Sequence, residues 1–551
     1  MTTYHQRKTA RNRSESGQAL VFMVLALSVF LLGAGALCVD MSNLWFHRQA
    51  AQNAADAACT AGAMDLLVDA QGGATGHQGF VNGAAFNCSV GSTAAPCQYA
   101  AKNGYTSNNT SPGSLVSVSF PGAVTGVPAS SLAPASLVPT AFMRVDVTDN
   151  VQTFFSGLLS GQKSQTVRSF AVCGVVLAQA PIPIILLNPT VTQAFQGNGT
   201  PTLKVLGGGP KSVQVNSSST TAVSFGGTID LSKAGQNFNG ADFGTYGGPA
   251  SATGTFLPGV GAWRYPASPV NDPFAQITAP AQPAAPAALA SPACTSAKIQ
   301  AGNCTVPYHD AVHGCPDTGG CTLYTAGYYP SGITVANTTA IFDPGLYYLN
   351  GGLALKQNSM VRPGTGPGDG SQGTIFYLTG TAPKCSGQTG LVCVGANSGK
   401  AGLDPFPTSK VQCTGGPAPD PNLNLPATLA GNVLLAPCTG TYGDPLGKYR
   451  GILFFGDRSS PDGGGWGGGG GFLLAGSMYF HQCNAAGTGV SCGATPTDFN
   501  AQFQLQGNSG SASYVLGEII ADTMSMGGTP TVNMALNPFA AYSTLKATLL
   551  R

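Results

Sequence analysis

The chain has 551 residues, a net charge of +2 and only 8% charged residues, so its polar surface must consist mainly of Ser, Thr, Asn, Gln and Gly. This composition does not supply the basic face that a nucleic-acid partner requires. The length exceeds what one hydrophobic core holds, and we expect two or three domains. The 77 glycines and 39 prolines, set among recurring aliphatic runs, indicate short strands joined by tight turns.

An uncharged apolar run at residues 19–39 decides the class of protein. It follows a basic tail, residues 1–18, and precedes Asp40. The basic residues of the tail are Arg7, Lys8, Arg11 and Arg13. A helix over this run measures about 32 Å, which is enough to cross the apolar core of a bilayer. The positive-inside rule predicts a single-pass inner-membrane protein with a cytoplasmic N-terminus and a periplasmic or otherwise extracytoplasmic bulk.

The same run could instead be a processed signal. A small-x-small pattern at 34–36 would suit a secretory signal peptidase, but the apolar run is longer than a usual signal core. Leu37 before Cys38 is too large for lipoprotein processing. A prepilin peptidase would cut after Gly17, yet Phe22 stands where such substrates usually carry Glu. We therefore favour an uncleaved anchor.

A membrane-proximal α+β domain is expected over residues 40–180. Residues 40–68 contain no Gly or Pro before Gly62, so the membrane helix should continue outward as one long rod. A small-residue face on this helix consists of Ala54, Ala57, Ala58 and Ala61. Such a face suits packing on its own domain better than on a partner helix. Strands are predicted at 114–120, 142–147 and 165–177.

The remainder of the chain has a mainly-β texture. We expect a β-rich segment at 181–278, a Pro/Ala spacer at 279–293 and a β-rich, disulfide-containing domain at 294–551. Short apolar strands alternate with turns of Asn-Gly, Asn-Ser and Gly-Gly, which favours a parallel β-solenoid. A β-sandwich is the alternative.

Fifteen cysteines indicate an oxidising compartment. We expect Cys38 in the membrane helix, Cys59 on the helix that follows and Cys173 as a small core residue. The disulfide candidates are Cys88, Cys97, Cys294, Cys304, Cys315, Cys321, Cys385, Cys393, Cys413, Cys438, Cys483 and Cys492. Pairs that are close in sequence, 88 with 97, 385 with 393 and 483 with 492, would close short loops.

The N-terminal block resembles a known family. ESGQALV at 15–21, the apolar run, VDM at 39–41 and QNAADAACTAGA at 52–63 together resemble the N-terminal segment of TadG-like proteins of the bacterial tight-adherence (Flp pilus) assembly system. The matching residues are Gly17, Gln18, Asp40, Gln52, Asn53, Ala54, Ala55, Asp56, Ala57, Ala58, Gly62 and Ala63. The resemblance implies an envelope protein that assembles or anchors adhesive pili, and it supplies no catalytic site.

Catalytic carboxylates are scarce in the chain. Of its two glutamates, Glu15 lies in the cytoplasmic tail, which leaves Glu518 alone beyond the membrane. Asp457 and Asp462 are the nearest sensible pair, but their Gly/Ser setting indicates a surface turn. A polysaccharide-cutting solenoid would need clustered acids, so we expect no enzyme.

One segment has the composition of a metal site. Cys304, His309, His313 and Cys315 have spacings that could hold zinc. In an oxidising compartment these cysteines should instead form disulfides with Cys294 and Cys321. We therefore predict no metal and no cofactor.

Four further motifs have simpler interpretations. The Gly-x-Ser-x-Gly string at 489–493 lacks a following histidine, and the Asp-Thr-Gly at 317–319 has no second copy. The Gly-rich string at 207–212 has Pro before Lys, unlike a P-loop. Trp466, in the Gly-rich run 463–471, could be an exposed stacking ring or a buried anchor of a flexible loop.

The leading hypothesis is a structural envelope protein for Flp pilus assembly or anchoring. Its expected partners are the lipid bilayer and other pilus-assembly or envelope proteins, with glycans as a further class and no nucleic acid. A membrane-tethered carbohydrate-active solenoid and a secreted adhesin are the alternatives.

Overall fold

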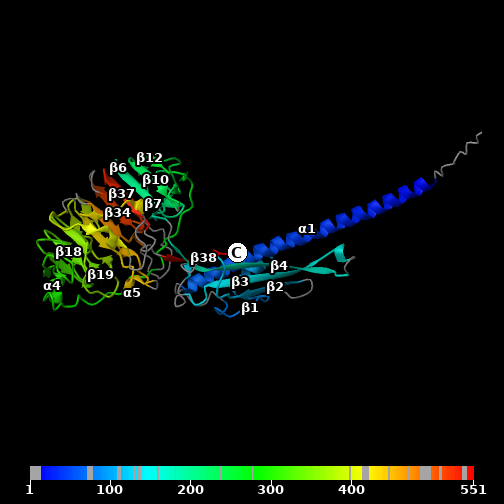
Figure 1. Ribbon diagram of the computed structural model, residues 1–551, viewed down its shortest axis with the longest axis horizontal. Helices are drawn as coiled ribbons and strands as arrows, with labels where there is room; N and C mark the ends of the chain where they lie inside the picture. The colour runs from blue at the N-terminus through cyan, green and yellow to red at the C-terminus, as the bar shows by residue number, and fades with distance from the viewer. Residues whose placement is uncertain are drawn as a thin grey trace, which may run out of the picture. The chain divides into compact units, whose positions relative to one another are not determined.

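The chain folds into two units (Figure 1). The computed structural model describes residues 14–70, 79–107, 113–127, 131–132, 138–157, 161–179, 182–235, 237–275, 277–395, 399–412, 421–444, 447–467, 471–483, 498–507, 512–536 and 543–550. Unit 1 comprises Met1–Leu177 and Leu545–Arg551, and unit 2 comprises Ala178–Thr544. Unit 2 is thus inserted in the sequence of unit 1, which contains both ends of the chain.

Unit 1 is a long helix on an antiparallel sheet. Helix α1, Ser14–Ala70, confirms that the apolar run continues outward as one rod. The other elements are β1 Phe86–Asn87, α2 Ala95–Lys102, β2 Ser114–Ser119, β3 Phe142–Gln152, β4 Ser164–Gln179 and β38 Ser543–Leu549. The sheet order is β1-β2-β3-β4-β38, and the pairs from β1 to β4 are antiparallel. The three strands expected from the alternating pattern correspond to β2, β3 and β4.

The core of unit 1 lies between α1 and the sheet. Ala51, Ala54, Ala55 and Ala58 are fully buried there, together with Val145 from β3. The buried face therefore includes positions 54 and 58 of the expected face, whereas positions 57 and 61 are only partly buried. As expected, the small-residue face packs on its own domain.

Unit 2 contains three large sheets that pair strands in parallel. Among the described residues, the ten-stranded sheet runs β13 Trp263–Arg264, β11 Asp242–Thr245, β8 Lys211–Val215, β5 Ile184–Leu186, β35 Ile519–Ala521, β32 Ser477–Phe480, β29 Ile452–Gly456, β22 Thr374–Thr379, β19 Gly345–Asn350, β16 Gly327–Tyr329. The eight-stranded sheet described runs β17 Ile333–Val335, β20 Leu353–Leu355, β25 Val392–Val394, β30 Gly464–Trp466, β33 Gln502–Gly507, β36 Thr523–Gly528, β6 Phe195–Gly199, β9 Val223–Phe225. Also among the described residues, the seven-stranded sheet runs β12 Thr255–Leu257, β10 Thr228–Ala234, β7 Thr202–Gly207, β37 Thr531–Ala535, β34 Ala512–Leu516, β31 Phe472–Ala475, β28 Asn432–Leu435.

Smaller elements complete unit 2. A further sheet contains β14 Thr305–Val306, β15 Cys321–Tyr324, β18 Thr339–Phe342 and β21 Met360–Pro363. Short hairpins pair β23 Lys384–Cys385 with β24 Gln388–Thr389, and β26 Phe406–Pro407 with β27 Thr428–Leu429. The short helices are α4 Ser296–Gln300, α5 Gly440–Gly443, η2 Thr408–Val411 and η3 Pro421–Leu423. The expected mainly-β content with parallel pairing is therefore confirmed.

The order of strands corrects the expected domain boundaries. Strands β5, β6 and β7 pair in parallel with β35, β36 and β37, so the segments 181–278 and 294–551 form one body and not two. From β5 the chain runs outward to β13, then passes to β16 at the opposite edge of the same sheet and returns. The Pro/Ala spacer 279–293 lies on this passage, and the Ala284 carbonyl accepts the Tyr328 amide at 2.9 Å. The last residues, 545–551, belong to unit 1.

Aromatic and aliphatic side chains stack through the core of unit 2. Tyr347, Phe376 and Phe454 stand side by side on β19, β22 and β29, and all three are fully buried. Their ring centroids lie 5.2 Å and 5.5 Å apart. Parallel in-register pairing places like residues in contact, and each buried ring contributes about 2 to 3 kcal/mol of hydrophobic stabilisation.

Disulfides occur in both units. The pairs are Cys59–Cys173, Cys88–Cys97, Cys294–Cys304, Cys315–Cys321 and Cys385–Cys393. Cys438 and Cys483 are also disulfide-bonded, whereas Cys413 and Cys492 lie outside the described residues. Cys38 is the free cysteine among those described. The assignment of Cys173 as a simple core residue is corrected, because its partner is 114 residues away in sequence and no local spacing indicates the pair.

Candidate functional site

The residues shared with the family lie along α1, and Asp40 is the one among them that lies at the end of the apolar run. It directly follows the apolar run and is buried. Its carboxylate accepts three consecutive backbone amides beyond the end of β3: Phe154 at 2.9 Å, Phe155 at 2.9 Å and Ser156 at 2.5 Å. Led by the bond from Ser156, these amides outweigh the effect of burial and lower the pKa of Asp40 to about 2. Asp40 is therefore an anion held in a nest of N–H groups that fastens the β3–β4 turn to the helix.

Further polar contacts follow along the same side of α1. The Asn43 side-chain amide donates to the Gln152 carbonyl at 3.3 Å. His47 Nδ1 lies 2.9 Å from an Asp149 carboxylate oxygen, which also accepts the Tyr105 hydroxyl at 3.3 Å. Burial, followed by the charge of Asp149, raises the pKa of Tyr105. These contacts tie successive turns of the helix to β3.

Gln52 continues this series on β4. Its side-chain amide donates to the Phe170 carbonyl at 3.0 Å and to the Asp56 carboxylate at 2.8 Å. Asp56 thus orients Gln52 from one helical turn away. One turn further on, the Cys59–Cys173 disulfide joins the helix covalently to β4.

The small family residues allow the helix to approach the sheet closely. Ala54, Ala55, Ala58, Gly62 and Ala63 are buried. A Cβ placed on Gly62 would lie 2.3 Å from the Met143 sulfur and 2.9 Å from Pro96 Cγ, so no larger residue fits without a shift. The family residues that point away are Asn53, which is exposed, and Ala57, which is partly exposed; Gly17 and Gln18 lie in the first turns of α1.

The motif therefore builds a helix-to-sheet junction. Sequence reasoning identified Asp40, Gln52 and the small residues through the family resemblance, but it missed Asn43, His47 and the Cys59–Cys173 bond. The partners of these three lie on β3 and β4, about 100 residues further on in the sequence. The spacing of 40, 43 and 47 along one helix face was the available signal.

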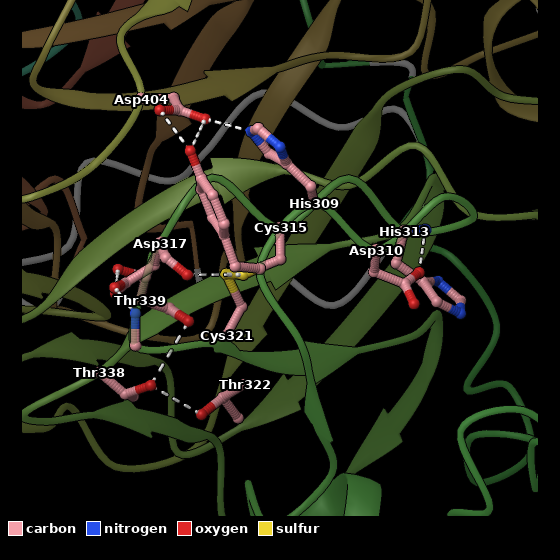
Figure 2. The surroundings of a disulfide bond; sticks show 12 residues. His309, Asp310, His313, Cys315, Asp317, Cys321, Thr322, Thr338, Thr339 and Asp404 are labelled. Atoms are coloured by element: carbon pink, nitrogen blue, oxygen red, sulfur yellow. Dashed lines mark hydrogen bonds and ion pairs between the residues drawn. A yellow bond between two sulfur atoms is a disulfide. The ribbon is translucent and has the colours of Figure 1, made fainter.

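The metal-like segment is built differently. Cys304 and Cys315 are in disulfides with Cys294 and Cys321, so neither sulfur is available as a thiolate ligand. His309 pairs instead with Asp404 at 2.6 Å, and His313 with buried Asp343 at 2.7 Å. Figure 2 shows the two histidines pointing to different sides of the segment. Among the residues that the structure describes, no three such side chains converge as a metal site would require.

The Asp-Thr-Gly motif at residues 317–319 contributes to the hydrogen bonding of the fold. Asp317 is buried beside the Cys315–Cys321 bond (Figure 2). It accepts the Thr339 hydroxyl at 2.6 Å and the Gly319 amide at 2.8 Å, and it pairs with Lys400. Burial alone would raise the pKa of Asp317, but the hydrogen bonds, led by that of Lys400, lower it. The carboxylate is thus held ionised and fully hydrogen-bonded within the fold.

A cavity of about 860 Å³ lies beside the same segment. Its charged lining consists of His309, Asp310, Arg362, Asp404 and Lys410. Asp310 accepts the backbone amides of residues 312 and 313, and Asp404 accepts the Tyr308 hydroxyl at 3.0 Å. Asp310 therefore holds its own loop in place, and Asp404 binds its segment to the one that carries Tyr308 and His309. A substrate would have to displace these bonds to reach either carboxylate.

The remaining candidates separate in the structure. The Asp457 carboxylate accepts the Ser459 amide at 3.0 Å and the Thr379 hydroxyl at 2.7 Å, as expected for a residue that closes a turn. Trp466 is buried in strand β30, so it is an anchor and the run around it is not wholly a loop. Glu518 is fully buried, and within the part of the chain that the structure describes neither of its carboxylate oxygens has a hydrogen-bond partner. The string at 489–493 lies outside the described residues.

Comparisons with known proteins identify the junction. Residues 17–65 match the Tad family, described as Flp pilus-assembly TadE/G-like. A comparison with curated proteins gave no match. Among solved structures, the competence-associated pilin ComZ from Thermus thermophilus aligns over 90% of this chain and 97% of its own, at 8% identity and a TM-score of 0.24, which is too low to argue from. The predicted resemblance is thus confirmed: residues 17–65 of this chain match the TadE/G-like family of Flp pilus assembly.

Proposed function

We propose that this chain is a single-pass envelope protein that helps to assemble or anchor Flp-type pili, acting through structure and not through catalysis. The form of the family segment carries the proposal. The segment is part of one helix whose first half presents apolar side chains outward and whose second half is fixed to the sheet of unit 1. Among the described residues, α1 is the one helix long and apolar enough to cross a membrane. Such a helix joins a bilayer to a folded domain.

The proposed topology has the N-terminus in the cytoplasm and both units beyond the inner membrane, with the anchor uncleaved. The basic residues before the apolar run support this orientation. Disulfides in both units support an oxidising compartment. Mass spectrometry of the mature N-terminus tests the uncleaved anchor; a chain beginning at Gln18 or Leu37 would contradict it.

We also propose that unit 2 is a parallel β-solenoid, presented to partners by unit 1. From β5 to β10 and from β28 to β37, consecutive strands visit the three large sheets in turn and pair in parallel with strands of the next coil. A β-sandwich would pair its strands mainly antiparallel. Unit 2 is connected to neighbouring strands of the unit 1 sheet, β4 and β38, so it is tethered at both ends.

The proposed partners are the bilayer and other components of a pilus system. The family match supports both, and it gives no support to glycans, which the proposal leaves out. A catalytic role is not proposed. The Asp457 carboxylate closes a turn, and at the cavity Asp310 accepts amides of its own loop and Asp404 accepts the Tyr308 hydroxyl.

The experiment is deletion of the gene followed by complementation with single variants. Deletion should reduce both the number of surface pili and attachment to surfaces. The wild-type chain and Asn53→Ala, which alters an exposed family residue, should restore both. A chain with Phe30→Asp in the apolar run should restore neither, because a charge near the bilayer centre costs about 3 kcal/mol or more. Unchanged piliation and attachment after deletion would contradict the proposal.

A further inference from the structure

Exposed aromatic side chains gather in unit 1 just beyond the apolar run. On the helix these are Trp45, 56% exposed, and Phe46, 65% exposed. On the turn after β3 they are Phe154, 65% exposed, and Phe155, 49% exposed. Two adjacent exposed phenylalanines directly after a strand form an apolar surface of the kind that marks a contact site.

The turn is held at a defined level on the helix. Its amides at Phe154 and Phe155 are bound by Asp40, which comes one residue after the apolar run. The rise of an α-helix puts Asp40 about 1.5 Å beyond the last apolar residue. The backbone of Phe154 and Phe155 therefore lies at the level where the apolar surface of the helix ends. In Figure 1 the β3–β4 end of the sheet extends along α1 toward the N-terminal half of the helix.

The helical aromatics belong to the same level. Trp45 and Phe46 follow Val39 by about 9 and 10 Å of helix rise. Helical side chains lean toward the N-terminus, so their rings reach back toward the apolar run. The polar interface of a bilayer is roughly 5 to 8 Å thick on each side, and it is where Trp and other aromatic rings concentrate.

A positive charge accompanies the aromatic pair. The Lys163 carbonyl accepts the Thr153 amide at 3.1 Å, which places Lys163 opposite the start of the turn, and this residue is exposed. The two aromatic rings suit the acyl boundary of a lipid surface, and the lysine suits its anionic headgroups.

We propose that the segment just after β3 is a second membrane contact, in which Phe154 and Phe155 enter the lipid interface beside the transmembrane helix while Asp40 holds their backbone at that depth. The inference rests on the proposed membrane anchoring. Two contacts, one helical and one on a hairpin, would prevent unit 1 from tilting freely about the helix. The orientation of unit 1 relative to the membrane would then be defined, as a component of an ordered assembly requires.

The test uses the full chain in liposomes of phosphatidylcholine and phosphatidylglycerol, with and without acyl-chain bromination. Phe154→Trp places a fluorescent probe on the turn. Tyr99→Trp is the matched control, because Tyr99 is an exposed aromatic residue on α2 of the same unit. We expect the added emission of Phe154→Trp to fall at least about twofold in brominated lipid, and that of Tyr99→Trp to remain unchanged.

Flotation of the liposomes separates the two proposals. A protein that floats with the lipid but shows no quenching at position 154 would overturn the membrane contact and leave the anchoring intact. A protein that does not float at all would overturn the anchoring and this inference with it. The emission at position 154 could instead be shielded from water equally in unbrominated and brominated lipid while copies of the chain cross-link. That result would assign the turn to a protein partner and would likewise overturn the inference.

Asp40→Asn, combined with Phe154→Trp, tests the role of the clamp. A neutral amide oxygen binds the three amides less strongly than a carboxylate does. The double variant should float as the wild type does, yet lose most of the quenching of the fluorescent probe on the turn. Asn53→Ala, at an exposed position of the same helix, should change neither readout when combined with the same probe. Full quenching in the presence of Asp40→Asn would show that Asp40 does not set the depth of the turn.

Discussion

Unit 1 buries a face of alanines and secures it with polar contacts, whereas unit 2 buries columns of large rings. In unit 1 the helix presents Ala54, Ala55 and Ala58 to the sheet, and each buried methyl group contributes only about 0.8 kcal/mol. In unit 2 the column of Tyr347, Phe376 and Phe454 buries far more apolar area per residue. The helix side of this core thus contributes little apolar area per residue, whereas the sheet side contributes larger residues such as Val145 and Val147. Polar contacts along the helix add to this packing.

The disulfides differ in the same sense. The Cys59–Cys173 bond of unit 1 joins residues 114 apart in sequence and fixes α1 to β4. Three bonds described in unit 2, Cys294–Cys304, Cys315–Cys321 and Cys385–Cys393, close short loops with separations of 10, 6 and 8, as Cys88–Cys97 does in unit 1 with 9. Buried carboxyl groups also differ within the molecule: Asp40 in unit 1 accepts three amides, and Asp317 in unit 2 is likewise hydrogen-bonded, whereas Glu518 in unit 2 has no hydrogen-bond partner among the described residues.

The largest effect is expected from Cys59→Ala with Cys173→Ala. A cross-link that closes a loop of about 100 residues stabilises a fold by roughly 4 to 5 kcal/mol through the unfolded chain. Hydrogen exchange measured by mass spectrometry on peptides of α1 and β3 reports the loss in unit 1 alone. The control is Cys88→Ala with Cys97→Ala, whose separation is 9 and whose loss should be nearer 2 to 3 kcal/mol, an estimate from the same loop entropy. Equal losses for the two pairs would contradict this account.

Phe376→Ala should destabilise unit 2 by about 3 to 5 kcal/mol, because it opens a cavity in the aromatic column. Phe376→Leu retains most of the volume and should cost about 1 kcal/mol. Denaturant titration followed by Trp466 emission measures both, since Trp466 is buried 6.2 Å from the Phe454 ring, centroid to centroid. If Phe376→Ala lowered the free energy of unfolding by less than Phe376→Leu does, the aromatic column would not be continuous.

Glu518→Gln should stabilise unit 2, and the gain should depend on pH. Burial raises the pKa of Glu518 well above its usual range. When the pKa of a carboxyl is higher in the folded than in the unfolded state, its contribution to the free energy of unfolding is greatest below the unfolded-state pKa. As the pH rises above that value, the free energy of unfolding falls by at most about 1.4 kcal/mol per pH unit. The melting temperatures of variant and wild type should therefore agree near pH 4 and diverge toward pH 7. A difference independent of pH would indicate that Glu518 is ionised in the fold.

Gly62→Ala should destabilise unit 1 by about 1 to 3 kcal/mol, because its Cβ meets the Met143 side chain and Pro96. Hydrogen exchange of the intact protein at increasing temperature, measured on peptides from unit 1, reports the loss of stability. Ala57→Gly, at a partly exposed position of the same helix, should cost about 1 kcal/mol through helix propensity alone. In a Met143→Ala background the alanine at position 62 should be better tolerated, and a full loss there would contradict the proposed clash.

Asp40→Asn should have the smallest effect on stability and the clearest pH signature. The lowered pKa of Asp40, about 2, means that its carboxylate stabilises unit 1 above the unfolded pKa near 4. This stabilisation is lost as the pH falls through that range toward 2. The asparagine variant should be less stable at neutral pH and should lack that part of the acid transition. An unchanged acid transition of unit 1 in the variant would show that Asp40 does not contribute to it.

Local pattern determined a large part of this protein. The apolar run, its continuation as one helix and the strands β2, β3 and β4 could be predicted, because each depends on periodicity and propensity within a short window. The family residues of α1 were identified by the same kind of local signal. The small-residue face was placed on its own domain, although its centre lies at Ala54, Ala55 and Ala58 and not at Ala57 and Ala61.

Only the tertiary structure decided which distant residues meet. The partners of Asp40 and Cys59 lie more than 100 residues away, and the pairing of β5 with β35 crosses most of unit 2. Parallel strands are joined by long connections, so nothing in a short window records which strand will be the neighbour. The sequence by itself therefore determined the elements and the membrane-proximal segment. The insertion of unit 2, the return of β38 and the clamp at Asp40 arise from non-local contacts, whose free energy is gained only when the chain has folded.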